Sequence, residues 1–290
     1  MSRRNGVLAK VPRGGVLVTL GVVAAVLVAA IGARLDSYGG DPTGFVQFGS
    51  ALSGLTQPPP GSVVLPGAGY DGQFYYRLAL NPGIPDDVRD GLAFFAGEFR
   101  AQRIAYPAMA GALAFGNAHA LAWTLLLVNV LAALLAAAAA AALLQAAGRS
   151  AWLAVAVGVT PGVVFAVLRD LTDVCALAGG LGAWWAWRAQ RPWLAGIAAS
   201  GAILSRETGA LVLLGVVWEV ARDRELRARV QAWLPAVAVP VGVYVAWSCA
   251  QQLRSAYRHP TPPKDARSPR RSSPRSRPAR SPRSPAWAAR

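Results

Sequence analysis

Acidic, basic and aromatic side chains gather at four short stretches of an otherwise apolar chain. In the first, residues 69–77, Asp71 lies beside Gly72 and is followed by Tyr75. A carboxylate in a glycine-flanked turn beside aromatic rings suits a general base, because its surroundings can tune its pKa and the rings can hold a sugar or lipid. The alternative is a solvated aspartate that caps a helix beginning near Gln73. The spacing alone favours neither interpretation.

The other three stretches place arginines and acids at the ends of apolar runs. They are Arg100, Arg103 and Tyr106; Arg169, Asp170 and Asp173; and Arg206 with Glu207. Arginine at a membrane edge can bind a lipid phosphate through paired hydrogen bonds, and charges at that depth are functional candidates by default. The alternatives are arginines that only anchor the chain at the interface and ion pairs that hold helix ends together.

Long uncharged runs must position these stretches. Of all residues, 54% are hydrophobic, and a bilayer core of roughly 30 Å needs about 20 apolar residues as a helix. The apolar runs are 14–33, 120–145, 151–168, 174–187, 192–205, 207–221 and 231–249. We therefore predict an all-α integral membrane protein with about seven transmembrane helices. Residues 104–116 are too few to cross and predict a juxtamembrane or re-entrant helix.

The charges between the runs predict which loops share a face of the membrane. Four basic residues precede the first run, so we expect an uncleaved signal-anchor with a cytoplasmic N-terminus. Read as one helix, residues 192–221 would bury Arg206 and Glu207 at mid-membrane. Read as a hairpin with its tip at 205–208, they put the basic loops 188–191 and 222–229 together in the cytoplasm. Loops 34–103, 169–173 and 205–208 then lie outside.

The chain divides into five parts on this interpretation. They are a cytoplasmic N-terminus (1–13), a first transmembrane helix (14–33), an extracytoplasmic loop with a juxtamembrane helix (34–119), a transmembrane bundle (120–249) and a disordered Arg/Ser/Pro-rich tail (250–290). Within the loop, residues 86–100 are compatible with a short amphipathic helix. The protein is expected in the cell membrane, in contact with membrane lipid.

The net charge of +15 does not indicate a nucleic-acid partner, because most of it belongs to the tail. Only Tyr257 and Trp287 lie among the tail arginines, too few to form the row of stacking platforms that a nucleic-acid strand would require. The abrupt change to Arg-Ser-Pro repeats suggests GC-rich DNA read out of frame, and the alternative is a solvated tail that binds polymer or lipid. Cys175, Cys249, His119 and His259 are isolated in sequence, so we predict no metal site.

Several of these stretches resemble motifs of the GT-C superfamily of membrane glycosyltransferases, in its mannosyl- and aminoarabinosyl-transferase branch. The matching segments are Asp71-x-x-x-Tyr75-x-x-x-Ala79, Arg103-x-x-Tyr106-Pro107, Leu168-Arg169-Asp170-x-x-Asp173 and Ala202-Ile203-Leu204-Ser205-Arg206-Glu207-Thr208. They are similar, in order, to the outer-loop motif, the re-entry segment, the acidic end of a later span and a short-helix hairpin. The nearest likeness is to bacterial members linked to cell-surface glycopolymers.

This resemblance implies a sugar donor on a polyprenyl monophosphate and a glycan or lipid acceptor. Asp71 would deprotonate the acceptor hydroxyl. The substrate-binding residues would be Tyr75, Arg103, Arg169, Asp173, Arg206 and Glu207, with the arginines on the leaving phosphate. No cofactor or metal is expected.

The chain departs from the family at two points. Gly72 replaces the second acid of the family's pair, and the family usually has more spans and often an outer C-terminal domain, so the chain resembles a C-terminally truncated member. Two other functions stay open at this point, a multi-pass transporter and a non-catalytic subunit of surface-polymer assembly. A transporter would place charges near the midplane among internal repeats and interrupted helices.

Overall fold

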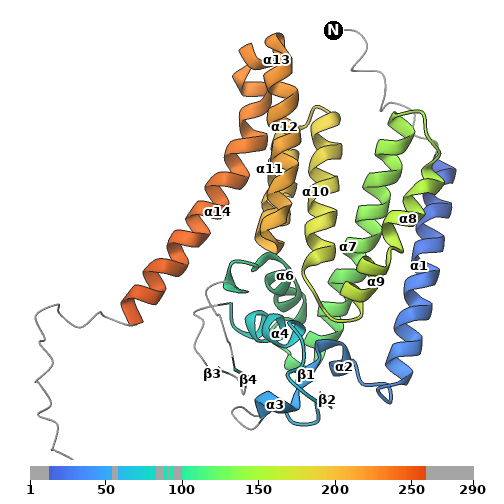
Figure 1. Ribbon diagram of the computed structural model, residues 1–290, viewed down its shortest axis with the longest axis vertical. Coiled ribbons are helices and arrows are strands. Elements are labelled where there is room, and N and C mark those ends of the chain that lie inside the picture. The colour runs from blue at the N-terminus through green and yellow to red at the C-terminus, as the bar shows by residue number, and fades with distance from the viewer. Residues whose placement is uncertain (1–12, 54–57, 83–87, 90–91, 94–99, 259–290) are drawn as a thin grey trace, which may run out of the picture.

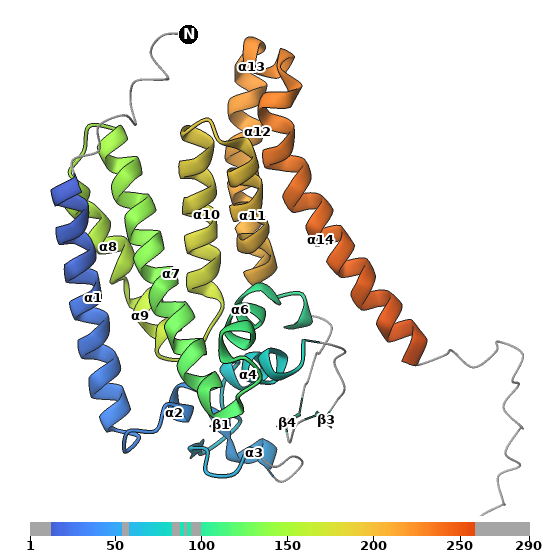
Figure 2. The same cartoon turned by 180° about the vertical axis from the view of Figure 1, so that it is seen from behind.

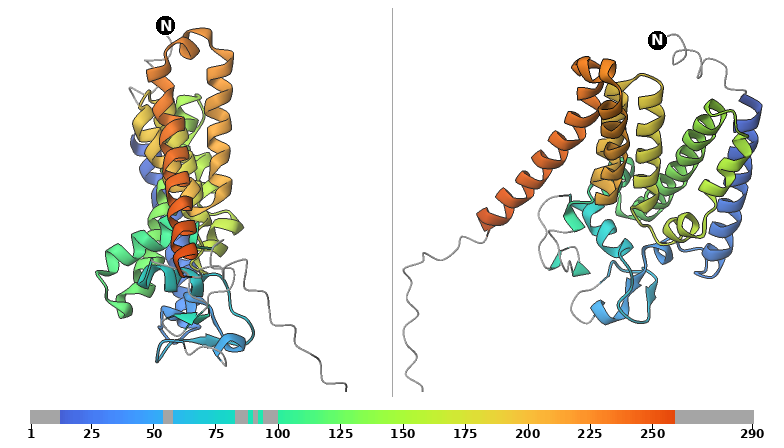
Figure 3. Two further views of the ribbon diagram at one scale, coloured as in Figure 1. Left: turned by 90° about the vertical axis from the view of Figure 1, so that its left-hand side faces the viewer. Right: turned by 45° about the horizontal axis from the view of Figure 1, so that its top comes forward.

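The computed structural model describes residues 13–53, 58–82, 88–89, 92–93 and 100–258, and its regular structure is almost entirely helical (Figure 1). The long elements lie lengthwise beside one another (Figures 1 and 2). They are α1 (Arg13–Asp36), α7 (Ala118–Ala146), α10 (Asp173–Arg188), α11 (Pro192–Ser205), α12 (Leu211–Arg222) and α14 (Val230–Arg258). α14 leans away from the others along its length (Figure 3). The expectation of an all-α architecture is confirmed.

Short elements gather at one end of this bundle, which we call the loop end (Figure 1). They are α2 (Thr43–Val46), β1 (Phe48–Gly49), α3 (Ser50–Ser53), β2 (Val64–Leu65), α4 (Gly72–Leu80), β3 (Val88–Arg89), β4 (Leu92–Ala93) and α6 (Ala105–Ala114). β1 pairs with β2 in parallel, with Phe48 opposite Val64. β3 pairs with β4 antiparallel, so the helix expected over 86–100 is wrong for the residues described there.

The apolar run 151–168 is broken into three pieces instead of forming one helix. They are η1 (Ala151–Ala154), α8 (Val155–Gly158) and α9 (Pro161–Val167). Pro161 has no backbone N–H, so it ends the helical hydrogen bonding before it and starts a new helix after it. The Thr160 hydroxyl caps that new helix by accepting a hydrogen bond from the Val163 N–H at 3.3 Å.

Three of the described helices are long and apolar enough to cross a membrane, namely Gly14–Asp36, Ala118–Ala146 and Val230–Leu253. Helix α11 is apolar but shorter. The sides of the bundle also expose large apolar side chains that water would not favour: Leu17, Val28, Leu131, Leu135, Trp193, Ile197, Leu211, Leu214 and Trp218. An exposed apolar surface of this extent is typical of a protein face that lipid or another apolar partner covers. These helices indicate association with a membrane, and the full count of seven spans stays a prediction.

The loops fall at the two ends of the bundle as the charges predict. The turns at 149, 188–191 and 222–229 lie at the end opposite the loop end, which we call the basic end (Figure 1). The α11–α12 hairpin is confirmed, with η2 (Glu207–Ala210) at its tip. The side of a membrane that each end faces stays a prediction. Helix α14 continues to Arg258, so residues 250–258 are helical, and the rest of the expected tail, like residues 1–12, lies outside the described residues.

Small residues let the helices behind the loop end approach closely. A methyl group on Gly179 of α10 would lie 2.7 Å from the backbone nitrogen of Ala202 in α11. One on Gly209 of η2 would lie 2.5 Å from the carbonyl carbon of the same Ala202. Such contacts are typical of helix packing within membranes. They hold the hairpin tip, and with it Arg206, firmly against α10.

Candidate functional site

Four segments that are far apart in the sequence meet at the loop end. They are the start of α4, the chain just before α6, the connection from α9 to α10, and the junction of α11 with η2. Ion pairs join them: Asp71 with Arg100 at 3.0 Å, Glu207 with Arg103 at 3.1 Å, and Asp173 with Arg206. All seven residues singled out as a site from the sequence therefore lie on segments that meet there.

Asp71 stands immediately before α4, but its side chain makes no capping hydrogen bond to that helix. Its Oδ1 atom instead accepts from Nε and Nη2 of Arg100 at 3.3 and 3.0 Å. Within the described part of the chain, Oδ2 accepts no hydrogen bond, and 36% of the side chain is exposed. The carboxylate is thus held through one oxygen while the other can take a proton from a bound molecule.

The two glycines that flank Asp71, Gly69 and Gly72, are required by close contacts with the protein's own backbone. Gly69 has a left-handed φ of +71°, and a methyl group there would lie 2.3 Å from the Gln47 carbonyl oxygen. A methyl group on Gly72 would lie 2.7 Å from the carbonyl oxygens of Arg169 and Val46. Position 72 therefore cannot carry the second acid of the GT-C pair unless the backbone around it moves.

Arg103 connects the α4 segment with the hairpin tip. Its Nε and Nη2 donate to the two carboxylate oxygens of Glu207 at 3.2 and 3.1 Å, and Nη1 donates to the Tyr75 hydroxyl at 3.4 Å. Burial works against the charged form, but the bonds to Tyr75 and Glu207 outweigh it, so the pKa of Arg103 is raised. The Tyr75 ring packs edge-on against Tyr106 at 6.0 Å. Arg103 is consequently a fixed cation in a mostly buried position.

The pair of Arg206 and Asp173 is the more open one. Asp173 is the first residue of α10 and Arg206 directly follows α11, so the pair ties two helix ends together. Their side chains are 36% and 40% exposed, so a ligand can reach both. The neighbours Arg206 and Glu207 do not pair with each other, because each turns to an acid or base on another segment.

Arg169 differs from the other site arginines in its partners. Its guanidinium lies over the ring of Phe165 at 4.2 Å and over that of Tyr70 at 4.9 Å. Among the residues that the structure describes, no acid pairs with it. Stacking on aromatic faces stabilises a cation without neutralising it. Arg169 therefore keeps its full charge beside the segment that carries Asp71.

A buried polar chain lies behind the site. Asp170 is fully buried with a left-handed φ of 49°, and its Oδ1 accepts from the Tyr106 hydroxyl at 3.4 Å. Asn129 of α7 donates to the same hydroxyl at 3.0 Å. Oδ2 of Asp170 has no partner in the described part of the chain. Burial raises the pKa of Asp170 well above its usual range, more than the Tyr106 hydrogen bond lowers it.

The sequence did not reveal the roles of three residues at this end, Arg100, Asn129 and Asp170. Arg100 was considered only as a phosphate-binding or anchoring arginine, although it is the partner of Asp71, three residues before Arg103 on the same turn. Asn129 was passed over, although an amide in the middle of the apolar run 120–145 is itself a signal of a polar contact at that depth. Asp170 was recognised only as part of the Arg169 motif. Its complete burial could not be deduced from the motif.

An apolar groove of about 1080 Å³ begins at the site and runs between α6, α7, α10 and α11. Ser205 and Met109 line it at the loop end, and Trp185, Leu194 and Val16 line it at the basic end. Alanines, leucines and glycines make up most of the lining between them. Ser205 directly precedes Arg206, so the groove ends beside the Arg206–Asp173 pair.

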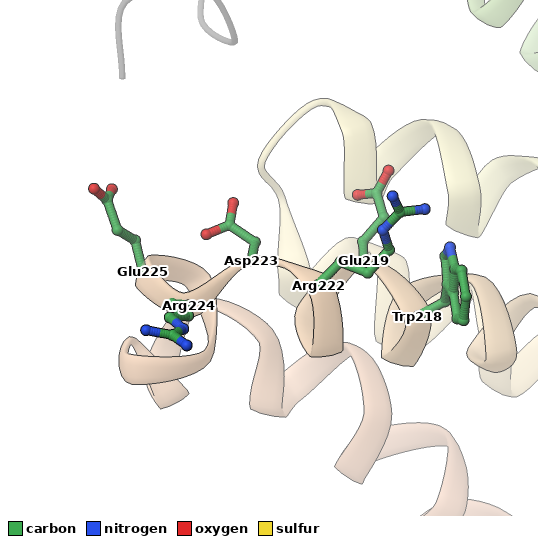
Figure 4. Close-up of a pocket in the computed structure, with 6 residues that line it drawn as sticks. All are labelled: Trp218, Glu219, Arg222, Asp223, Arg224 and Glu225. Carbon is green, nitrogen blue, oxygen red and sulfur yellow. The ribbon is translucent and has the colours of Figure 1, made fainter.

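A second hollow, of about 650 Å³, lies at the basic end. Figure 4 shows its six residues, which come from the end of α12, from α13 (Arg224–Ala228) and from Asp223 between the two helices. Glu219 there already accepts hydrogen bonds from Trp187 and Arg188, at 2.9 and 2.8 Å, so its carboxylate is engaged by the protein itself.

The described residues contain no group of three or more His, Cys, Asp or Glu that could hold a metal ion. Their chemistry rests on carboxylates, guanidinium groups and aromatic rings. Comparison of the chain with protein-family models, with curated proteins and with solved structures finds no match.

Proposed function

We propose that this protein is a membrane glycosyltransferase that moves a sugar from a polyprenyl-phosphate donor to an extracytoplasmic acceptor during cell-surface glycan formation. One observation carries the proposal. A half-exposed carboxylate, Asp71, and several arginines from distant segments meet where a long apolar groove ends. A substrate with a long apolar chain, an anionic link and a polar reacting group matches that arrangement from end to end.

The groove suits the polyprenyl chain of such a donor. Its lining is almost wholly aliphatic, and it extends from the level of Trp185 to Ser205. A chain lying there would bring its phosphate to Arg206, which is exposed enough to receive it. Preorganised cations at the place where phosphate charge develops are the expected source of transition-state stabilisation. Arg103 lies next in the network through Glu207, and Tyr75 orients it.

Asp71 then acts as the general base. Its free Oδ2 accepts the proton of an acceptor hydroxyl, and the hydroxyl oxygen attacks the anomeric carbon of the donor sugar. The bond from that carbon to the phosphate oxygen breaks, with inversion at the carbon. The phosphate keeps the electron pair and leaves as polyprenyl phosphate, with Arg206 and Arg103 beside its new charge. Arg100 keeps the base in position through Oδ1.

A transfer assay tests this assignment. Membranes that contain the protein are incubated with radiolabelled polyprenyl-phosphate sugars, and transfer is compared with that by the Asp71→Asn protein. Loss of a general base lowers the rate by about 10²–10⁴-fold. Asp223→Asn, at a carboxylate that caps α13 at the opposite end of the bundle, is the control and should transfer normally. Near-normal transfer by Asp71→Asn removes the assignment of the base.

The same assay separates the roles of two residues. Arg206→Ala should raise KM for the donor more than it lowers kcat, because an interaction made already with the bound donor is lost. Asp71→Asn should lower kcat while donor binding persists. Equal loss of folding in both proteins would instead support a purely structural network. A wild-type protein that binds donor but never transfers it would support a non-catalytic assembly subunit.

The proposal includes a multi-pass topology with a cytoplasmic N-terminus and an extracytoplasmic loop end. It is supported by the excess of arginine at the basic end, since cytoplasmic loops carry such an excess. Single cysteines at Ser62, Thr208 and Ser150 test it, in a background that lacks the exposed Cys249. Thr208 is chosen at the hairpin tip because it is exposed, whereas Ser205 is buried. An impermeant reagent should label positions 62 and 208, and labelling at 150 instead would reverse the orientation.

A transporter is the second candidate, on a separate observation. The helix interrupted at Thr160 and the buried carboxyl of Asp170 are features of proteins that move ions or solutes across membranes. Reconstitution of the protein in sealed vesicles distinguishes the two functions. Solute or proton flux that is lost in Asp170→Asn, in the absence of any donor lipid, would favour the transporter.

A further inference from the structure

One part of the loop end has no role in the donor chemistry just described. It consists of Tyr70, Phe165 and Arg169, which we call the Arg169 platform. The two rings meet edge to face with centroids 5.8 Å apart, and the guanidinium lies over both. Tyr70 is 39% exposed and Phe165 is 42% exposed. Large rings with this exposure beside an unneutralised cation form a surface that a ligand can cover.

The platform and the donor groove lie on different elements. Phe165 belongs to α9, Arg169 follows that helix, and Tyr70 belongs to the loop before α4. The groove is lined from α6, α7, α10 and α11 at this end, and no residue of the platform contributes to it. Asp71 directly follows Tyr70, and the Gly72 backbone packs against the Arg169 carbonyl. The base is therefore adjacent to the platform, while its partner Arg100 lies on the segment before α6.

We propose that the Arg169 platform binds the acceptor, and that this acceptor is a sugar chain bearing a carboxylate or phosphate group. The ligand's role as acceptor rests on the proposed function, whereas its chemical class follows from the side chains of the platform. Aromatic rings present flat apolar faces to the C–H groups of a sugar, as they do to other apolar partners. The guanidinium presents paired donors to a carboxylate or phosphate.

The charge of Arg169 is the reason to expect an anionic acceptor. The other arginines discussed in the site each have a carboxylate partner, namely Asp71, Glu207 or Asp173. An anion that approaches those pairs must compete with the resident carboxylate. Within the described part of the chain, Arg169 instead contacts two aromatic rings and no carboxylate. A neutral sugar would leave this cation without a partner. An anionic sugar satisfies it and places a neighbouring hydroxyl beside Asp71.

A binding experiment without any donor tests the inference. The full-length protein in nanodiscs is titrated with a fluorescent tetrasaccharide that contains glucuronic acid, and with the same tetrasaccharide after its carboxylates are reduced to alcohols. A third probe is maltotetraose phosphorylated on one primary hydroxyl. We expect one or both charged probes to bind about tenfold or more tightly than the neutral one, the range of a charge-assisted hydrogen bond. The probe that binds identifies whether the anion is a carboxylate or a phosphate.

Variants assign the effect to the platform. Arg169→Gln should abolish the preference for charge, Arg169→Lys should restore part of it, and Tyr70→Leu should weaken charged and neutral probes alike. Arg222→Gln is the matched control, because Arg222 likewise lies over a ring, that of Trp218 at 5.3 Å, but at the basic end. It should bind as the wild type does. Melting curves establish that each variant is folded, and the lysine variant carries the test if another does not fold.

Three results would overturn the inference: equal binding of charged and neutral probes, an equal effect of Arg222→Gln, or displacement by inorganic phosphate as effective as by the charged tetrasaccharide. The last would show a simple anion site. Because binding is measured without donor, its failure is distinct from failure of the proposed function. Charge-blind binding with normal transfer contradicts the platform alone. Charge-dependent binding by a wild-type protein that transfers no sugar contradicts the proposed function alone.

Discussion

The loop end and the basic end both hold arginines near acids, but they do so at different depths. At the loop end the Arg103 side chain is 9% exposed and bonds to both oxygens of Glu207. At the basic end the Arg188 side chain is 48% exposed and reaches Glu219 through a single nitrogen. Exposed pairs contribute little to stability, whereas mostly buried ones are costly to break.

The two ends also differ in their balance of charge. Among the residues that the structure describes, the basic end carries Arg149, Arg188, Arg191, Arg222, Arg224, Arg227 and Arg229, and the fewer acids Glu219, Asp223 and Glu225. At the loop end the acids of the site match its arginines, apart from Arg169 and the buried Asp170. An uncompensated excess suits orientation in a membrane, whereas matched pairs between segments suit a defined geometry. The proposed chemistry therefore belongs to the loop end, and the basic end suits anchoring.

The largest difference in stability between the two ends is expected when the backbone contact at Gly72 is disturbed. Gly72→Ala should lower the free energy of unfolding by about 2–3 kcal/mol, because its methyl group would overlap the carbonyl oxygens of Arg169 and Val46. Gly14→Ala, at the basic end of α1 with nothing within 4 Å, is the control and should be close to neutral. Denaturation in detergent measures both. Equal stability of the two variants would mean that the loop end yields easily.

The buried carboxyl of Asp170 at the loop end should make the stability of the protein depend on pH. The pKa of folded Asp170 lies well above its ordinary value of 3.8 because of burial. The folded protein therefore holds a proton that the unfolded chain releases, and stability falls as pH rises above about 4, by at most about 1.4 kcal/mol per pH unit. In Asp170→Asn this dependence should disappear. Melting temperatures between pH 5 and 7 give the measurement.

Thr172→Val provides the control for that experiment. Thr172 is also buried and its hydroxyl has no hydrogen-bond partner within the described residues, but it does not titrate. Its replacement should leave the slope of stability against pH as in the wild type. A slope that persists in Asp170→Asn would show that the proton belongs to another group.

The smallest expected change in stability comes from neutralising one acid at each end. Glu207→Gln removes the charge that faces the mostly buried Arg103 and should cost about 1–2 kcal/mol, reduced from the fully buried case because water reaches Glu207. Glu219→Gln faces the exposed Arg188 and should cost about 0–1 kcal/mol. Thermal unfolding of both variants in the same detergent measures the difference. A larger loss at Glu219 would reverse the assignment of the structural network.

Much of the architecture could be predicted because it depends on local composition. The uncharged runs around α1 and α7 must be helical in an apolar phase, since only internal hydrogen bonds satisfy the backbone there. The charges of Arg206 and Glu207 split residues 192–221 into two helices, because they are too costly to place at mid-membrane. Loops of like composition were grouped correctly at the two ends for the same reason.

The local errors have equally local causes. Pro161 breaks a run that hydrophobicity alone would continue through 151–168. The strands at 88–89 and 92–93 form through pairing with each other, which amphipathic spacing does not reveal. Helix α14 continues beyond the apolar run 231–249 to Arg258, since helical hydrogen bonding does not require apolar side chains.

The composition and order of residues thus determined the helices, the hairpin and the shared end at which Asp71, Arg103, Asp173 and Arg206 lie. Only the tertiary structure decided that Arg100 holds Asp71, that Glu207 turns from its neighbour Arg206 to Arg103, and that Arg169 rests on two rings. The physical reason is that ion pairs between segments depend on angstrom distances set by helix packing. A close backbone contact, such as that at Gly72, arises only when two distant segments meet.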